Sequence, residues 1–232
     1  MRSMDGSICS GVVAGREVHF FVVNKQDEIQ RYHAAGTFYE AEELEIIAKY
    51  FPRGGVFADC GAHVGNHTIF VGMYLHPAQV IVVEPNPAAI PILQVNIALN
   101  GLMRVTDLTW LGTGLSDARS FADAVIHPNN LGRTSLLPTS HPGGIRLVPG
   151  DEIFSQRRVD FIKLDVEGME IAALSGLAAT IARWRPSMFI EVDDNHAAAF
   201  QGWLAKAGYV TAMRCRRYPL NENYMVLPME RG

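Results

Sequence analysis

Two acidic stretches of the chain each follow a run of apolar residues, as side chains do at the end of a buried strand. Asp59 ends the first run and precedes a turn that contains Gly61 and Gly65. Glu84 lies nineteen residues after Gly65, at the end of another apolar run. The second stretch covers residues 165–170 and holds three acids. Carboxylates at such places accept hydrogen bonds from ribose hydroxyls, act as a general base, or bind a hard cation.

The elements that must position these acids alternate between strands and helices. We predict buried strands over residues 56–59, 80–84, 105–110, 161–165 and 188–191. Their continuous apolar character is typical of a parallel sheet covered on both faces. We predict helices over residues 66–75, from about Asn86 to Asn100, along 171–181, and over 195–207. Repeated strand–helix units indicate an α/β fold with a doubly wound, Rossmann-like sheet.

The two ends of the chain and one internal segment depart from this repeat. Residues 1–35 are predicted to form an extension with a small hairpin, and residues 36–232 the main part of a single domain. The last two strand-like runs, 209–215 and 224–227, predict an antiparallel hairpin at the C-terminus. Residues 118–150 are rich in Pro, Gly, Asn and Ser, so we expect an irregular segment that serves as a lid or acceptor loop.

The turn after Asp59 favours S-adenosylmethionine over a dinucleotide. Its spacing is G-x-x-x-G with His63 at the centre, whereas the dinucleotide motif G-x-G-x-x-G needs a central glycine close to a pyrophosphate. Asp59 would repel a pyrophosphate and could instead hold the ammonium of a methionine moiety through water. Glu84 is placed to accept hydrogen bonds from the ribose.

The acids after the strand at 161–165 are candidates for the catalytic step. We predict that Asp165 is the general base, directly or through a metal ion, and that Glu167 shapes the site, with Glu191 as a further candidate. Glu170 is expected to cap a helix N-terminus. We assign no metal ligand, although a divalent ion is compatible with the cluster. We expect His67 and His196 to be ordinary surface or hydrogen-bonded residues.

Composition limits the classes of function. The formal net charge is −4, which disfavours a nucleic-acid partner, and the longest apolar runs are too short to span a bilayer. The three cysteines are too few and too scattered for a disulfide framework or a zinc site, and they favour the cytoplasm. The oligomeric state stays open, a homodimer being one alternative.

The chain resembles the FkbM-type methyltransferases, a branch of the class I S-adenosylmethionine-dependent enzymes. The matching stretches are residues 38–40, 59–68, 83–87, 96–102, 115–117, 163–170 and 185–192. The resemblance implies a seven-stranded class I fold with a reversed final hairpin, and O-methylation of a small molecule such as a natural product or a sugar. His63 is a departure, since the family commonly has Asn there.

The resemblance also implies which residues hold the cofactor. Ser116 and Asp117 should approach the adenine, and Tyr39 and Glu40 should help to close the pocket. The full predicted cofactor set is Tyr39, Glu40, Asp59, Gly61, Ala62, His63, Gly65, Asn66, Glu84, Pro85, Asn86, Ser116, Asp117 and Asp165. The alternatives are an NAD(P)-dependent oxidoreductase, a non-catalytic nucleoside-binding module, and a methyltransferase acting on RNA or protein.

Overall fold

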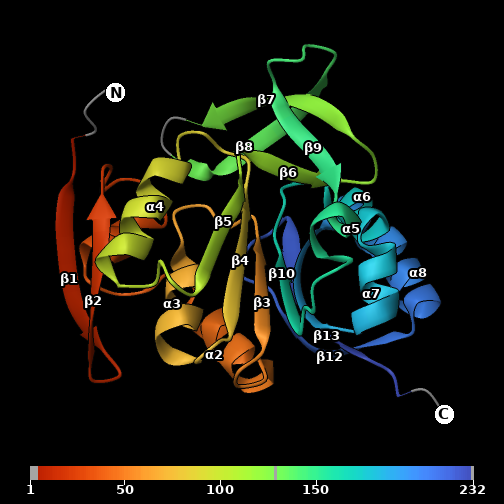
Figure 1. The fold of residues 1–232 in the computed structure, drawn as a ribbon, viewed down its shortest axis with the longest axis horizontal. Helices are drawn as coiled ribbons and strands as arrows, with labels where there is room; N and C mark the ends of the chain where they lie inside the picture. The colour runs from red at the N-terminus through yellow and green to blue at the C-terminus, as the bar shows by residue number, and fades with distance from the viewer. Residues whose placement is uncertain (1–4, 128–129, 231–232) are drawn as a thin grey trace.

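A seven-stranded sheet forms the centre of the computed structural model, which describes residues 5–127 and 130–230 (Figure 1). In spatial order its strands are β12 (Tyr209–Cys215), β13 (Asn221–Pro228), β11 (Ser187–Asp193), β10 (Phe161–Leu164), β3 (Val56–Cys60), β4 (Gln79–Glu84) and β5 (Thr106–Leu111). The strands from β11 to β5 are parallel, and β13 runs antiparallel between β11 and β12. The structure therefore confirms the predicted doubly wound sheet and its reversed C-terminal hairpin.

Helices cover both faces of this sheet. One face carries α2 (Ala41–Tyr50), α3 (Asn66–Tyr74) and α4 (Ile90–Leu99), and the other carries α5 (Gly150–Phe154), α6 (Glu170–Gly176), α7 (Ala178–Trp184) and α8 (Ala197–Ala207), which follows the short 3₁₀ helix η1 (Asp194–His196). Alternate residues of β4 enter the two apolar cores: Val80 and Val82 pack on one face, Ile81 and Val83 on the other. Burial on both faces explains why the strands read as unbroken apolar runs.

Local sequence signals mark both ends of α4, but not every helix boundary. Pro91 lies within the first two positions of α4, where its missing N–H is harmless, and Gly101 follows the helix end with φ +70°. The helix predicted along residues 171–181 is wrong as a single element, because it is divided at Leu177. The Asp151 side chain accepts hydrogen bonds from the backbone of residues 179 and 180, and so provides a new helix start there.

The N-terminal hairpin forms as predicted, from β1 (Ser7–Val13) and β2 (Arg16–Val22), and is followed by α1 (Gln30–Ala34). The first four residues of the predicted extension lie outside the described part of the chain. Two asparagines of the α4 region hold β2: Asn96 Oδ1 accepts from Phe21 N at 2.6 Å and Asn100 Oδ1 from His19 N at 3.0 Å. The hairpin is therefore fastened to the main sheet by way of α4.

The expectation of an irregular segment over residues 118–150 is wrong. This segment supplies β7 (Ser120–His127), β8 (Asn130–Thr139) and β9 (Ile145–Pro149), which form a second sheet with β6 (Thr113–Ser116) in the order β6-β9-β7-β8. Residues 128 and 129 lie outside the described chain. Pro138 is accommodated because β8 is an edge strand, where a residue without an N–H group loses no hydrogen bond to a neighbouring strand. The strands are stabilised by pairing with one another, which composition does not reveal.

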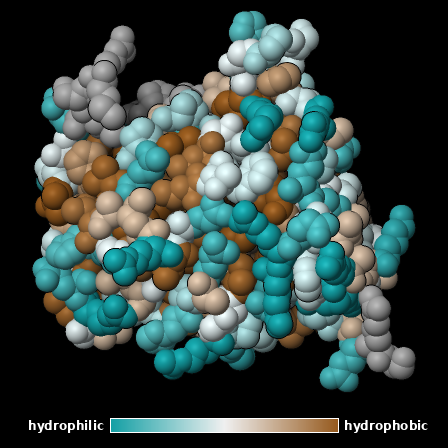
Figure 2. Space-filling model, in the orientation of Figure 1, coloured by the Kyte–Doolittle hydropathy of each residue, from teal (hydrophilic) through white to brown (hydrophobic). Residues whose placement is uncertain are grey.

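The second sheet lies above the carboxyl ends of the central strands in Figure 1. Figure 2 shows a hydrophobic area in the middle of this face of the molecule, with hydrophilic side chains around and below it. Among the described residues, every helix is too short or too polar to cross a membrane.

Candidate functional site

A cavity of about 680 Å³ opens at the carboxyl ends of the parallel strands. Its walls come from the loops after β3, β4 and β10, from β8, and from the turn between β12 and β13. The lining residues that the sequence predicted are Tyr39, Glu40, Gly61, Ala62, His63, Asn66, Glu84, Pro85, Asn86, Asp165 and Glu167. A cavity of this size at this edge is where α/β sheets bind ligands.

The loop after β3 runs very close to the neighbouring strand end. Because Cys60 pairs with Leu164, Gly61 lies beside Asp165, and a Cβ on Gly61 would stand 1.7 Å from the Asp165 carbonyl oxygen. Gly61 also has φ +82°, so both space and conformation demand glycine here. His63 takes φ +53°, a left-handed conformation that side chains rarely adopt, within a loop tied to its neighbours.

Glu84 ends β4 and organises this loop. Its Oε2 accepts from His63 N at 2.6 Å and its Oε1 accepts from Asn86 N at 2.7 Å, and the residue is only 4% exposed. Burial raises the pKa of Glu84 to about 7, although the hydrogen bonds from Asn86 and His63 oppose the rise. Asn86 Nδ2 in turn donates to Thr134 Oγ1 at 2.8 Å, which links the site to the second sheet.

Asp59 and Gly65 lie behind the cavity wall, not in it. Asp59 Oδ2 accepts from Thr68 Oγ1 at 2.6 Å, and its Oδ1 lies 3.8 Å from Lys163 Nζ. Burial raises the pKa of Asp59, and Lys163 and Thr68 oppose this. Gly65 precedes α3, with Leu93 packed against it. The contact between Asp59 and a methionine ammonium stays a prediction, because the contacts found for Asp59 are internal.

Tyr39 and Glu40 lie at the start of α2 and reach the cavity with Asn66. Asn66 holds the Tyr39 backbone on both sides, since its Oδ1 accepts from Tyr39 N at 3.0 Å and its Nδ2 donates to Tyr39 O at 2.9 Å. The Tyr39 hydroxyl donates to Glu28 at 3.1 Å. Burial, followed by the charge of Asp165, raises the pKa of Glu40 to about 8. These residues line the cavity together, and their contact with a cofactor stays a prediction.

Ser116 is the last residue of β6 and Asp117 follows it; neither lines the cavity, whereas the preceding Gly114 and Leu115 do. Ser116 Oγ donates to Asp117 Oδ1 at 3.2 Å. Contact between these two residues and an adenine therefore stays a prediction.

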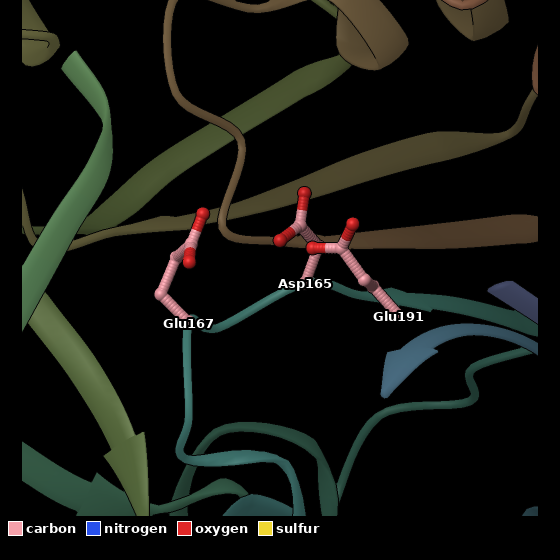
Figure 3. A group of neighbouring side chains, drawn as sticks. All are labelled: Asp165, Glu167 and Glu191. Atoms are coloured by element: carbon pink, nitrogen blue, oxygen red, sulfur yellow. The ribbon is translucent and has the colours of Figure 1, made fainter. Parts of the chain in front are cut away.

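Three acids of the cavity wall converge, two from the loop after β10 and one from β11 (Figure 3). One ligand oxygen from each of Asp165, Glu167 and Glu191 lies within 4.8 Å of the others, and Figure 3 shows the Asp165 and Glu191 carboxyl groups side by side. Burial and the charge of Asp165 raise the pKa of Glu191 far above its usual value, and Glu191 donates a hydrogen bond to Asp165. Burial acts to raise the pKa of Asp165, but the Lys163 ammonium and this hydrogen bond hold it below its usual value.

Lys163 was not among the predicted site residues. Its Nζ donates to Gly61 O at 2.7 Å and to Asp165 Oδ2 at 3.0 Å, so it joins the two loops that form the cavity. The sequence signal for it was a lysine inside an apolar strand, because a buried lysine needs a partner. Glu28 and the turn residues 218–221 also line the cavity. They are far from the motifs in sequence, and no local pattern marks them.

His196, Glu170 and His67, to which the sequence analysis gives no catalytic role, have different surroundings. His196 Nδ1 lies 2.7 Å from Glu170 Oε2. Glu170 is the first residue of α6, and its Oε1 accepts from Gly168 N, just before the helix, at 2.9 Å. Neither residue lines the cavity. His67 does line it, is 6% exposed, and has no hydrogen-bond partner for Nε2 among the described residues.

Comparison with known proteins identifies one family. The model of the FkbM methyltransferase domain matches residues 59–212. The crystal structure of methyltransferase FkbM from Methylobacillus flagellatus KT aligns with a TM-score of 0.52 and 18% identity, over 75% of this chain and 44% of that one. This chain therefore spans less than half the length of that protein. No curated protein matches the chain.

Two further solved structures share the architecture. The M1A22 tRNA methyltransferase TrmK of B. subtilis aligns with a TM-score of 0.52 and 14% identity, over 83% of this chain and 68% of that one. An rRNA methylase from Streptococcus thermophilus aligns with a TM-score of 0.51 and 12% identity, over 82% and 95% respectively. At these identities the similarity establishes the fold alone.

Proposed function

Because the chain belongs to the FkbM methyltransferase domain family, we propose that it transfers the methyl group of S-adenosylmethionine to a hydroxyl group of a small molecule. The observation that carries this proposal is the position of Glu84 in the cavity wall. Backbone N–H groups of the adjoining loops hold its carboxyl group, and the acids that follow β10 line the same cavity. We propose that Glu84 accepts hydrogen bonds from the ribose hydroxyls.

The charge of the cavity supports this cofactor over a dinucleotide. Seven lining residues are Asp or Glu, and the one lysine or arginine among the described lining residues, Lys163, already binds Gly61 and Asp165. A pyrophosphate would meet repulsion from the carboxylates that stay ionised, Asp165 among them, whereas a sulfonium and an ammonium group would not. These acidic walls would also repel the phosphates of an RNA acceptor, so their charge supports a small molecule as the methyl acceptor.

The chain's own residues can promote transfer in two ways. When bound, S-adenosylmethionine supplies a methyl group on a sulfonium, which is already a good leaving group. The loops around Gly61 and Asp165 adjoin each other in the wall of one cavity and can align donor and acceptor; such orientation contributes about 7–11 kcal/mol in favourable cases. We propose that Asp165, kept ionised by Lys163, accepts the proton of the acceptor hydroxyl, and that Glu167 orients the acceptor.

The second sheet is proposed as the cover of the acceptor site. Thr134 and Leu136 of β8 line the cavity, and the bond from Asn86 to Thr134 holds this strand over the loop after β4. We also propose that the protein works in the cytoplasm, in keeping with its three free thiols.

Thermal shift with nucleosides tests the proposal directly. S-Adenosylhomocysteine at about 100 times its Kd should stabilise the chain by about 2.7 kcal/mol, which corresponds to a Tm increase of about 5–10 °C for a domain of this size. NAD⁺ and NADP⁺ serve as matched controls and should leave Tm unchanged. Stabilisation by the dinucleotides but not by S-adenosylhomocysteine would establish the oxidoreductase alternative instead.

Cofactor affinity is expected to rise with pH. Because burial raises the pKa of Glu84 to about 7, its side chain changes from a protonated acid to a carboxylate between about pH 6 and 8, and the carboxylate is the better acceptor for ribose hydroxyls. Isothermal titration with S-adenosylhomocysteine should give an affinity about tenfold higher at about pH 8 than at about pH 6.

The Glu84→Gln variant is the control for this pH effect, and it should show a much flatter profile. An equal pH dependence in the variant would assign the titration to another group.

The stability of the unliganded chain should change with pH in the opposite direction. A pKa raised on folding means that the folded state holds the proton more tightly, so Glu84 stabilises the fold below about pH 4.5 and loses this contribution as pH rises through about 7.

A further inference from the structure

The strand register places two carboxyl groups of the cavity next to each other. Leu164 of β10 pairs with Ile190 of β11, so Asp165 and Glu191 follow at the same level of the sheet. Glu167 joins them because the chain turns sharply after β10: Glu167 has φ +40° and Gly168 has φ +82°. The three carboxyl groups come from two places in the chain, the loop after β10 and strand β11, and present oxygens within 4.8 Å of one another (Figure 3).

The positive charge nearby does not balance these acids. Lys163 Nζ lies 3.0 Å from Asp165 Oδ2, and it also donates to Gly61 O. It is the one lysine or arginine among the described residues of the cavity wall. One ammonium faces three acids, so the cluster keeps an excess of negative charge even though Glu191 holds a proton. A divalent cation bound by the three carboxyl groups would compensate this excess.

A second observation, independent of the acids, points to a ligand in the same cavity, close enough to Asp165 for the Asp165 charge to act on His67. His67 is 6% exposed and lines the cavity from the first turn of α3, yet its Nε2 has no hydrogen-bond partner among the described residues. Glu40 Oε2 is 3.9 Å from this nitrogen, beyond hydrogen-bond distance. Buried polar atoms without a partner are rare, and a water bound to a cation in the cavity would supply one.

We propose that Asp165, Glu167 and Glu191 bind one divalent cation, with His67 hydrogen-bonded to a water on that cation. Carboxylate oxygens are the ligands of hard cations, and a site of few carboxylates with several waters suits Mg²⁺ or Mn²⁺, whereas zinc prefers nitrogen and sulfur. Binding of the cation does not depend on the proposed methyl transfer. Its use does: beside a methyl donor, the cation would hold the acceptor hydroxyl and make its proton easier to remove.

Titration with Mn²⁺ in the absence of any nucleoside tests the site. Electron paramagnetic resonance of free Mn²⁺ should report one saturable site per chain, and Mg²⁺ should displace the ion. Glu167→Gln and Glu191→Gln should each weaken binding by at least about tenfold. Glu167 is exposed, so its variant removes a ligand without disturbing the core.

Asp193→Asn is the matched control, because Asp193 lines the same cavity and its loss changes the charge equally, but it lies outside the cluster. It should bind Mn²⁺ like the unchanged chain. Absence of saturable binding, or equal weakening in Asp193→Asn and in the cluster variants, would overturn the proposal. Either result leaves the proposed function untouched, because cofactor binding is measured separately by thermal shift.

Discussion

Replacing Glu84 with alanine is expected to weaken the binding of S-adenosylhomocysteine by about 100-fold or more. The substitution removes the proposed acceptor for the ribose hydroxyls, and hydrogen bonds to a charged group contribute about 1.5–3 kcal/mol each. It also leaves the N–H groups of His63 and Asn86 without the carboxylate that now accepts from both. Isothermal titration at about pH 8, where the carboxylate form of Glu84 prevails, measures the effect.

Two variants control this experiment. Glu84→Gln keeps the length of the side chain and one oxygen acceptor, so its affinity should fall between that of the unchanged chain and that of the alanine variant. Glu152→Gln removes an acid that pairs with Arg119 outside the cavity wall, and this variant should bind normally. An alanine variant that is folded by circular dichroism and binds with normal affinity would refute the proposed role of Glu84.

The Asp165→Asn protein is expected to lose turnover by about 10²–10⁴-fold, the usual contribution of a positioned acid or base. The asparagine side chain in this variant would keep the shape of the aspartate but could not accept the proton of an acceptor hydroxyl. Cofactor affinity should fall much less than in Glu84→Ala, because the proposed ribose contact is made by Glu84. The measurement is transfer of a labelled methyl group to the acceptor that a screen of small hydroxyl compounds identifies.

Asp193→Asn again provides a variant with the same loss of charge in the same cavity, and its turnover should stay close to normal. Near-normal turnover in Asp165→Asn with bound cofactor would reject Asp165 as the base. Mn²⁺ titration of the Asp165→Asn protein separates two roles of Asp165. If Asp165 acts through the cation, this variant must lose metal binding. If Asp165 accepts the proton directly, turnover falls even where metal binding is kept.

The sequence predicted those parts of the fold in which local pattern and tertiary structure agree. β3, β4 and β10 are buried on both faces, and their apolar runs show this directly. The strands of the second sheet contain Ser, Thr, Asn and Pro, and they are stable through pairing with each other. The break at Leu177 was missed because the capping side chain, Asp151, comes from another helix.

The same distinction holds for the site. The loops at Gly61, Glu84 and Asp165 could be found because each follows a recognisable strand, and parallel strands bring their carboxyl ends to one edge. Glu28 and residues 218–221 reach the cavity only through the packing of the N-terminal extension and the C-terminal hairpin around it. Ser116 was assigned through the resemblance, whereas the structure brings the preceding residues 114 and 115 to the wall.

The close contact between Gly61 and the Asp165 carbonyl has a consequence for redesign of the proposed activity. Because no side-chain atom fits between the two backbones, the loop after β3 and the loop after β10 form a fixed unit. A mutation in either loop is therefore expected to disturb the other as well. Leu136 in the edge strand and Leu220 in the C-terminal turn border the cavity without belonging to that unit. Libraries that aim at new acceptors should therefore vary those two positions and leave the unit unchanged.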